Sequence, residues 1–96
     1  MPNKIRVFKN SSFRDYRGFY WSSWKKGSIK KIKFRHDKFS LSKKNVLRGL
    51  HGDKKTWKLL SCPYGKLLLV VVNCLKKSKN YLKWKSWILS HKNGIQ

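Results

Sequence analysis

Lys66-Leu-Leu-Leu-Val-Val-Val-Asn-Cys-Leu75 contains the longest apolar run of the chain, from Leu67 to Val72. Aliphatic residues occupy both alternating faces of this run, which is typical of a strand enclosed within a two-sheet structure. The triplet Pro63-Tyr-Gly65 precedes it and predicts a turn, because Pro fixes φ and Gly accepts a positive φ. The region therefore predicts a turn followed by an interior β-strand.

The rest of the chain repeats this pattern of short extended segments separated by polar or Gly-containing turns. No stretch carries the 3.6-residue apolar stripe of a helix with its start and stop signals. We expect further strands at residues 4–8, 17–24, 29–35, 46–51, 57–62 and 83–89, and a loop at 39–44. Near-regular strands in a chain of 96 residues predict one small all-β domain of antiparallel strands, as a sandwich, jelly roll or barrel.

The charge of the chain is strongly positive. Lys and Arg number 25 against three acidic residues, and the net charge is +22. Such a chain binds polyanions nonspecifically, so a nucleic-acid partner has to be considered. The lysines are spread along the whole sequence, however, whereas a nucleic-acid-binding element usually gathers its basic residues on one face. We treat the charge as weak evidence for a nucleic-acid function.

The two cysteines and the apolar segments bear on cellular location. Cys62 and Cys74 are too few for a disulfide framework or a zinc site, and we expect both to be small buried residues of a reduced protein. The N-terminal residues lack the apolar core of a signal peptide, and the run from Leu67 to Val72 is too short for a membrane helix. These features predict a cytoplasmic protein without a bound metal.

The segment Arg48-Gly-Leu-His51 carries the most specific chemical signal. Gly49 within an expected strand suggests a bulge, which could turn Arg48 and His51 to the same side. An Arg suits a phosphate or carboxylate group, and a His suits proton transfer. Without further context, an isolated His in a strand is more often structural than catalytic.

This segment resembles the Arg-Gly-Leu-His signature of the dTDP-4-dehydrorhamnose 3,5-epimerase family, whose members have a cupin-type jelly roll. Four more blocks resemble the family in the same order along residues 5–93. They are Phe13-Arg-Asp-Tyr-Arg-Gly-Phe19, His36-Asp-Lys-Phe-Ser-Leu-Ser42, Thr56-Trp-Lys-Leu-Leu60 with the strand after Gly65, and residues 78–90. A single block would be a weak signal, but the ordered set is specific.

The resemblance implies a role for each matching residue. His51 would be the base that removes protons beside the keto group of a dTDP-linked sugar, and Lys58 would stabilise the resulting enolate. The substrate-binding positions would be Phe13, Arg17, His36, Lys38 and Arg48. The resemblance implies neither a metal nor another cofactor.

The chain also departs from the family pattern. Ser22, Leu69 and Asn73 stand where the family has acidic residues, and Thr56 replaces a Gln. His36 and Lys38 replace the Gln and Asn of the second block. The catalytic Tyr and the acid that orients the base belong to the second half of the family's fold. We therefore expect a partial, truncated jelly roll with little or no activity of its own, covered at its open edge by a second copy or a complementary chain.

Two other functions remain open at this point. The chain could be a non-catalytic cupin that binds a sugar nucleotide, as the substituted polar positions suggest. It could also be a basic nucleic-acid-binding β-barrel whose Trp residues stack on bases. We expect most of the five Trp residues to lie in a core or an interface instead.

Overall fold

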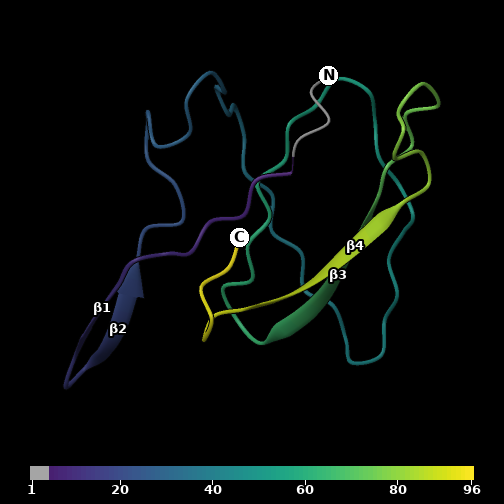
Figure 1. The fold of residues 1–96 in the computed structure, drawn as a ribbon. Coiled ribbons are helices and arrows are strands. Elements are labelled where there is room, and N and C mark those ends of the chain that lie inside the picture. Colours follow the sequence, from purple (N-terminus) through teal and green to yellow (C-terminus); the bar gives the residue numbers. More distant parts are fainter. Residues whose placement is uncertain (1–4) are drawn as a thin grey trace.

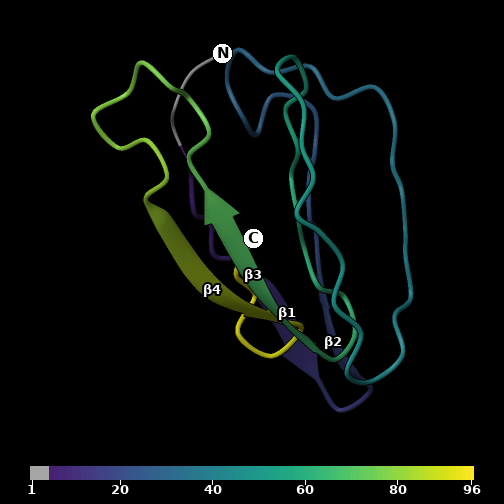
Figure 2. The same cartoon turned by 90° about the vertical axis from the view of Figure 1, so that its right-hand side faces the viewer.

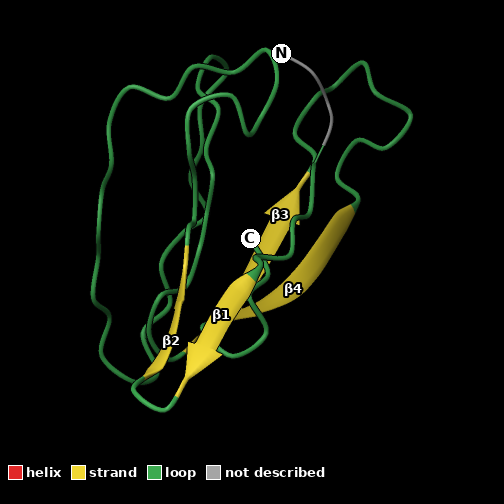
Figure 3. Ribbon diagram, turned by 90° about the vertical axis from the view of Figure 1, so that its left-hand side faces the viewer, coloured by secondary structure: helices red, strands yellow, loops and turns green. Residues whose placement is uncertain are grey.

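The computed structural model describes residues 5–96, and it contains four strands in two separate sheets. Strands β1 (Ser12–Asp15) and β2 (Gly18–Trp21) form one antiparallel pair, and β3 (Lys66–Val72) and β4 (Trp84–Ser90) form the other (Figure 1). No helix occurs among the described residues (Figure 3). The predicted fold class, all-β with antiparallel strands, is confirmed.

The first hairpin is closed by a tight turn at Tyr16 and Arg17. Asp15 pairs with Gly18 across this turn, so only two residues connect the strands. Gly18 has a φ of 132°, a conformation that favours glycine. The Asp15 carboxylate accepts the backbone N–H of Arg17, which fixes the turn from within.

The second hairpin joins β3 to β4 over seven residue pairs, from Lys66 opposite Ser90 to Val72 opposite Trp84. Its connection is held by Asn73, whose Oδ1 accepts the N–H of Leu75 and whose Nδ2 donates to Ser78 Oγ. The predicted turn at residues 63–65 and the strand at 83–89 are therefore confirmed within one residue. The strand expected over residues 66–75 is confirmed as well, but it ends at Val72.

The C-terminal segment pairs with the beginning of the described chain. Phe8 and Gln96 exchange two backbone hydrogen bonds around the bridge between Lys9 and Ile95. Asn93 fixes the preceding turn, because its side chain accepts the N–H groups of Ser90 and Ile95 and donates to Ile88 O. The pairing of Phe8 and Lys9 with Ile95 and Gln96 brings the end of the second hairpin beside the first hairpin (Figure 2).

Several predicted strands are absent from the structure. Residues 29–35, 46–51 and 57–62 are turns and loops, and residues 5–8 are not a strand either; Lys4 lies outside the described residues. Each of these segments alternates polar and apolar residues, which suggested a strand. A strand also needs a hydrogen-bonded neighbour, however, and none of these segments has a neighbouring strand in the described part of the chain.

The packing is less enclosed than the sequence predicts. Leu68 on β3 is 66% exposed, so the expectation of a strand covered on both faces is wrong for this chain. Within residues 5–96, the buried residues are Ile29, Cys62, Leu89 and Ser90. Burial is confirmed for Cys62 and wrong for Cys74, which follows β3 in the exposed connection; both are free thiols. Two hairpins supply too few layers to cover both faces of either sheet.

Candidate active site

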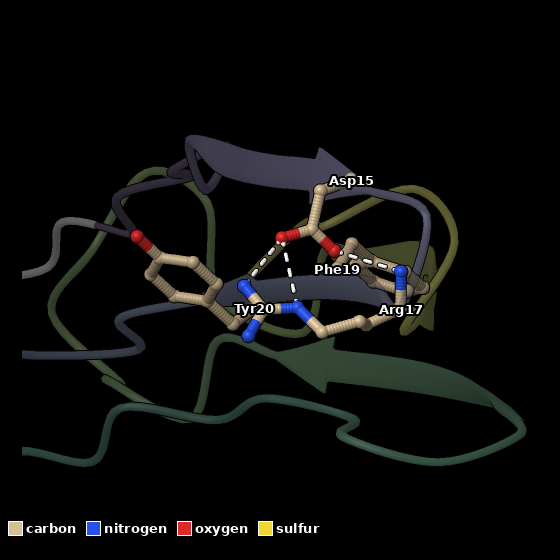
Figure 4. A pocket seen from close by; sticks show the side chains of 5 residues that line it. Asp15, Arg17, Phe19 and Tyr20 are labelled. Carbon is tan, nitrogen blue, oxygen red and sulfur yellow. Dashed lines mark hydrogen bonds and ion pairs between the residues drawn. The ribbon is translucent and has the colours of Figure 1, made fainter.

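The tip of the first hairpin places Arg17 against Asp15. The guanidinium Nη2 lies 2.7 Å and Nε 3.2 Å from Asp15 Oδ2, and the Arg17 backbone N–H lies 2.8 Å from Oδ1. Figure 4 shows the Arg17 side chain folded back onto this carboxylate. A cleft of about 350 Å³ opens here, lined by Asp15, Arg17, Gly18, Phe19 and Tyr20. Arg17 is thus held in one orientation beside an open cavity.

Phe13 lies next to this cleft on the same face of the hairpin. Its ring stacks on Tyr20, with centroids 5.4 Å apart and ring planes 26° from parallel. The two residues are direct partners in the register of β1 and β2. The structure therefore brings together two of the predicted substrate-binding residues, Phe13 and Arg17, through Tyr20.

Asp15 is a residue that the assignment of roles omitted, although it stands within the first matching block. The side-chain hydrogen bond from Arg17, followed by the backbone hydrogen bond from the same residue, lowers the pKa of Asp15 below its ordinary value of 3.8. An ionised Asp15 binds the Arg17 guanidinium through Nε and Nη2. The remaining N–H groups of the guanidinium can bind another anion.

The pH dependence of this contact is a testable expectation. A carboxyl whose pKa is lower in the folded state stabilises that state above its unfolded pKa, and this contribution disappears as the pH falls through the folded pKa. The Arg17 amide resonance in NMR should therefore hold its position from neutral pH to the ordinary Asp value of 3.8 and move below it. The Asp15→Asn variant should show no such movement. An Arg17 amide that moves equally in both proteins would contradict the assignment.

Arg48 and His51 lie in the exposed loop that follows the second matching block. Arg48 Nε donates to Ser42 Oγ at 2.7 Å, which ties Arg48 to the end of the second matching block. Gly49 between them has a φ of 127°, a backbone conformation that disfavours any side chain. The expected bulge in a strand is thus a glycine-dependent bend in a loop. His51 is exposed. A Cβ atom added to Gly49 would lie 3.9 Å from the imidazole Nδ1 of His51.

Lys58 is paired with a carboxylate that the prediction did not include. Its Nζ lies 3.9 Å from Asp53 Oδ2, and both side chains are about half exposed. Asp53 Oδ1 accepts the N–H groups of Lys55 and Thr56, and these bonds lower the Asp53 pKa. The sequence could have indicated the place of Asp53, because an Asp followed by polar residues favours a turn.

The remaining predicted residues, His36 and Lys38, lie in the exposed loop at residues 32–43. Arg48, His51 and Lys58 do not line the cleft at the hairpin tip. Among the described residues, no three His, Cys, Asp or Glu side chains gather in a way that could hold a metal ion. No helix in this part of the chain is long and apolar enough to cross a membrane.

Comparison with known proteins places these residues in a family context. The family model described as dTDP-4-dehydrorhamnose 3,5-epimerase matches residues 3–96. The enzyme of that name from Salmonella typhimurium is 34% identical over 100 residues, which cover 96% of this chain and 55% of the relative. The Escherichia coli K12 enzyme is 36% identical over 96% of this chain and 54% of its own length. The Neisseria gonorrhoeae enzyme is 32% identical, and the match covers 30% of it.

The chain spans about half the length of the Salmonella and Escherichia relatives that it matches. No solved structure matches it. The antiparallel all-β fold agrees with a part of a cupin-like jelly roll, and the match to the family model extends over nearly all residues of the chain. The chain therefore belongs to the dTDP-4-dehydrorhamnose 3,5-epimerase family.

Proposed function

We propose that this chain binds a dTDP-linked 4-keto-6-deoxy sugar and carries the base side of a 3,5-epimerase site. The observation that carries the proposal is the family match over residues 3–96, within which Arg48-Gly-Leu-His51 stands in the order expected of the family signature. A role in polysaccharide biosynthesis in the cytoplasm follows from this assignment, and the two free thiols are compatible with a reducing compartment.

In the proposed reaction, a neutral His51 takes a proton from the carbon next to the keto group. The electron pair of that C–H bond forms the C=C bond of an enolate, whose negative charge resides on the former keto oxygen. Lys58 stabilises this oxygen through its ammonium group. To do so, the ammonium group must replace part of its contact with Asp53 by a contact with the oxygen. Return of a proton to the opposite face inverts the carbon.

The cationic and aromatic residues would hold the remainder of the substrate. The Arg17 guanidinium lies at the hairpin-tip cleft, and the Arg48 guanidinium is hydrogen-bonded to Ser42. Both guanidinium groups suit a diphosphate. The stacked pair of Phe13 and Tyr20 offers a flat surface for the base. His36 and Lys38 would add polar contacts from the neighbouring loop.

We further propose that residues 1–96 alone turn over substrate weakly or not at all. Nothing in the assigned set supplies the proton for the opposite face, and Arg48, His51 and Lys58 do not line the cleft at the hairpin tip. A second copy of the chain, or a complementary chain, would close it. The exposed apolar residues on β3 and β4, Leu68 and Ile88 among them, support a covering partner.

A non-catalytic sugar-nucleotide-binding protein is the second candidate, and the surroundings of Asn73 favour it. This residue stands where the resemblance expects an acid, and its side chain is fully engaged in the turn after β3. Leu69, at the other such position, is half-buried in β3. Neither position can supply a carboxylate, whereas the binding residues Phe13 and Arg17 are retained.

Calorimetric titration with dTDP tests the proposal. We expect saturable binding of one dTDP per chain, weakened about tenfold by Arg48→Gln because a charge-assisted contact to phosphate is lost. Lys79→Gln, which removes the same charge from the connection between β3 and β4, should leave the affinity nearly unchanged. An equal loss in the two variants would show that only the overall charge attracts dTDP and would contradict the proposal.

A further inference from the structure

The first hairpin has a second face that also lines a cleft. Side chains alternate along a strand, so Phe13, Asp15 and Tyr20 lie on the face that carries the proposed dTDP contacts. Ser12 and Arg14 of β1 are the register partners of Trp21 and Phe19 of β2, and these four residues lie on the opposite face. The C-terminal segment from His91 to Gly94 approaches that opposite face and closes a cleft of about 340 Å³ with it.

The cleft is cationic and lacks acidic groups. Lys9, Arg14 and Lys92 line it, together with Asn10, Ser12 and Asn93, and none of its lining residues is Asp or Glu. The two ion pairs within residues 5–96 are those of Arg17 with Asp15 and Lys58 with Asp53, so the three cations of the cleft have no carboxylate partner there. Three positive charges that line one cleft without a carboxylate partner favour an anionic ligand.

A row of parallel rings forms the floor of this cleft. Phe19 stacks on Trp21 at 5.4 Å and faces His91 at 6.4 Å between ring centroids, with planes within 20° of parallel in both pairs. The guanidinium of Arg14 lies 5.2 Å from the centre of the Phe19 ring, which orients it by a cation–π contact. His91 is fixed in turn, because its Nδ1 accepts the backbone N–H of Gly65 at 3.1 Å. The neutral ring therefore carries its proton on Nε2.

We propose that this cleft is a second ligand site, which takes a small molecule bearing a phosphate group. Arg14 and Lys92 would hold the phosphate, and the ring row would pack against a planar part of the ligand. The volume is larger than a bare phosphate needs and lies near the lower end, about 300 Å³, of clefts that hold small organic ligands. The site goes beyond the proposed epimerase function, since none of the eight residues assigned to that function lines it.

Titration with ADP, followed by NMR at the indole N–H of Trp21 and the amide of Lys92, tests this site. We expect both signals to shift together along one saturable binding curve, whether or not ADP also enters the proposed dTDP site. The double variant Arg14→Gln/Lys92→Gln should bind about tenfold or more weakly, because two charge-assisted contacts to phosphate are lost. The matched control is Lys76→Gln/Lys77→Gln, which removes the same charge from the far end of the second hairpin and should bind within about twofold of the unaltered chain.

Lys92→Glu alone is the second variant, because no hydrogen bond of the described structure involves the Lys92 side chain and the fold should persist. It should also weaken ADP binding by about tenfold through charge reversal. The proposal is overturned if the control pair weakens binding as much as the cleft pair, or if ADP shifts neither Trp21 nor Lys92. Failure of this site leaves dTDP binding at Arg17 and Arg48 unaffected, so the two proposals are tested separately.

Discussion

Replacement of His51 by Ala is expected to abolish the proton abstraction that the chain can perform. In D2O, the unaltered chain incubated with a dTDP-4-keto-6-deoxy sugar should introduce deuterium beside the keto group slowly, if at all. A general base contributes about 10²–10⁴-fold to such a step, so His51→Ala should reduce any exchange to the background of the sugar alone. Mass spectrometry of the recovered sugar measures the label.

The Escherichia coli relative provides the reference rate in this experiment. We expect exchange by residues 1–96 to be about 10²-fold or more slower, because none of the residues assigned in the proposal orients the His51 imidazole as a base. Lys77→Gln, in the connection between β3 and β4, is the control for a change in charge and should exchange at the rate of the unaltered chain. Exchange at the reference rate would refute weak activity, and undiminished exchange by His51→Ala would remove this residue from the mechanism.

The second large effect concerns salt, which separates a sugar-nucleotide site from a nucleic-acid site. We expect a chain with a net charge of +22 to bind single-stranded DNA at low salt. If such binding uses six or more phosphate contacts, affinity should fall by about 10³-fold between about 50 and 200 mM salt, because counterion release is lost. Binding of dTDP, which presents only a diphosphate, should fall by less than about tenfold over the same range.

Fluorescence anisotropy with a labelled oligonucleotide measures the first affinity, and calorimetry measures the second. Excess dTDP should displace little of the DNA at low salt, since the lysines that attract DNA are spread along the chain. DNA binding that resists salt and is displaced by dTDP would instead favour the basic nucleic-acid-binding protein as the function of the chain.

The strands that the sequence predicted correctly have local partners. Lys66–Val72 and Trp84–Ser90 pair through a connection closed by Asn73 and Ser78, so the information for pairing lies within one hairpin. Gly18–Trp21 lies within the predicted strand at residues 17–24, and it pairs around the Asp15 turn with Ser12–Asp15, a strand that was not predicted. Residues 29–35, 46–51 and 57–62 have similar alternation but no nearby partner. Alternation describes which side chains share a face, and it does not say whether a neighbouring strand exists.

The candidate site was predictable to a similar extent. Family blocks identified Arg17, Arg48, His51 and Lys58, but the blocks do not report that Arg17 and Lys58 are each paired with an Asp. These carboxylates are set by short-range turn chemistry, which is visible in the sequence only as an Asp before polar residues. The cleft near His91 depends on contact between the two ends of the chain, and no local pattern predicts that contact.

One titration addresses the central claim directly, namely that His51 and its cationic neighbours hold a keto-sugar diphosphate. A dTDP-4-keto-6-deoxy sugar is added to the chain while NMR follows the imidazole signals of His51 and the side-chain signals of Arg48 and Lys58. We predict that the three move together and saturate at one sugar nucleotide per chain. A stationary His51, with small shifts spread evenly over the lysines, would contradict the claim.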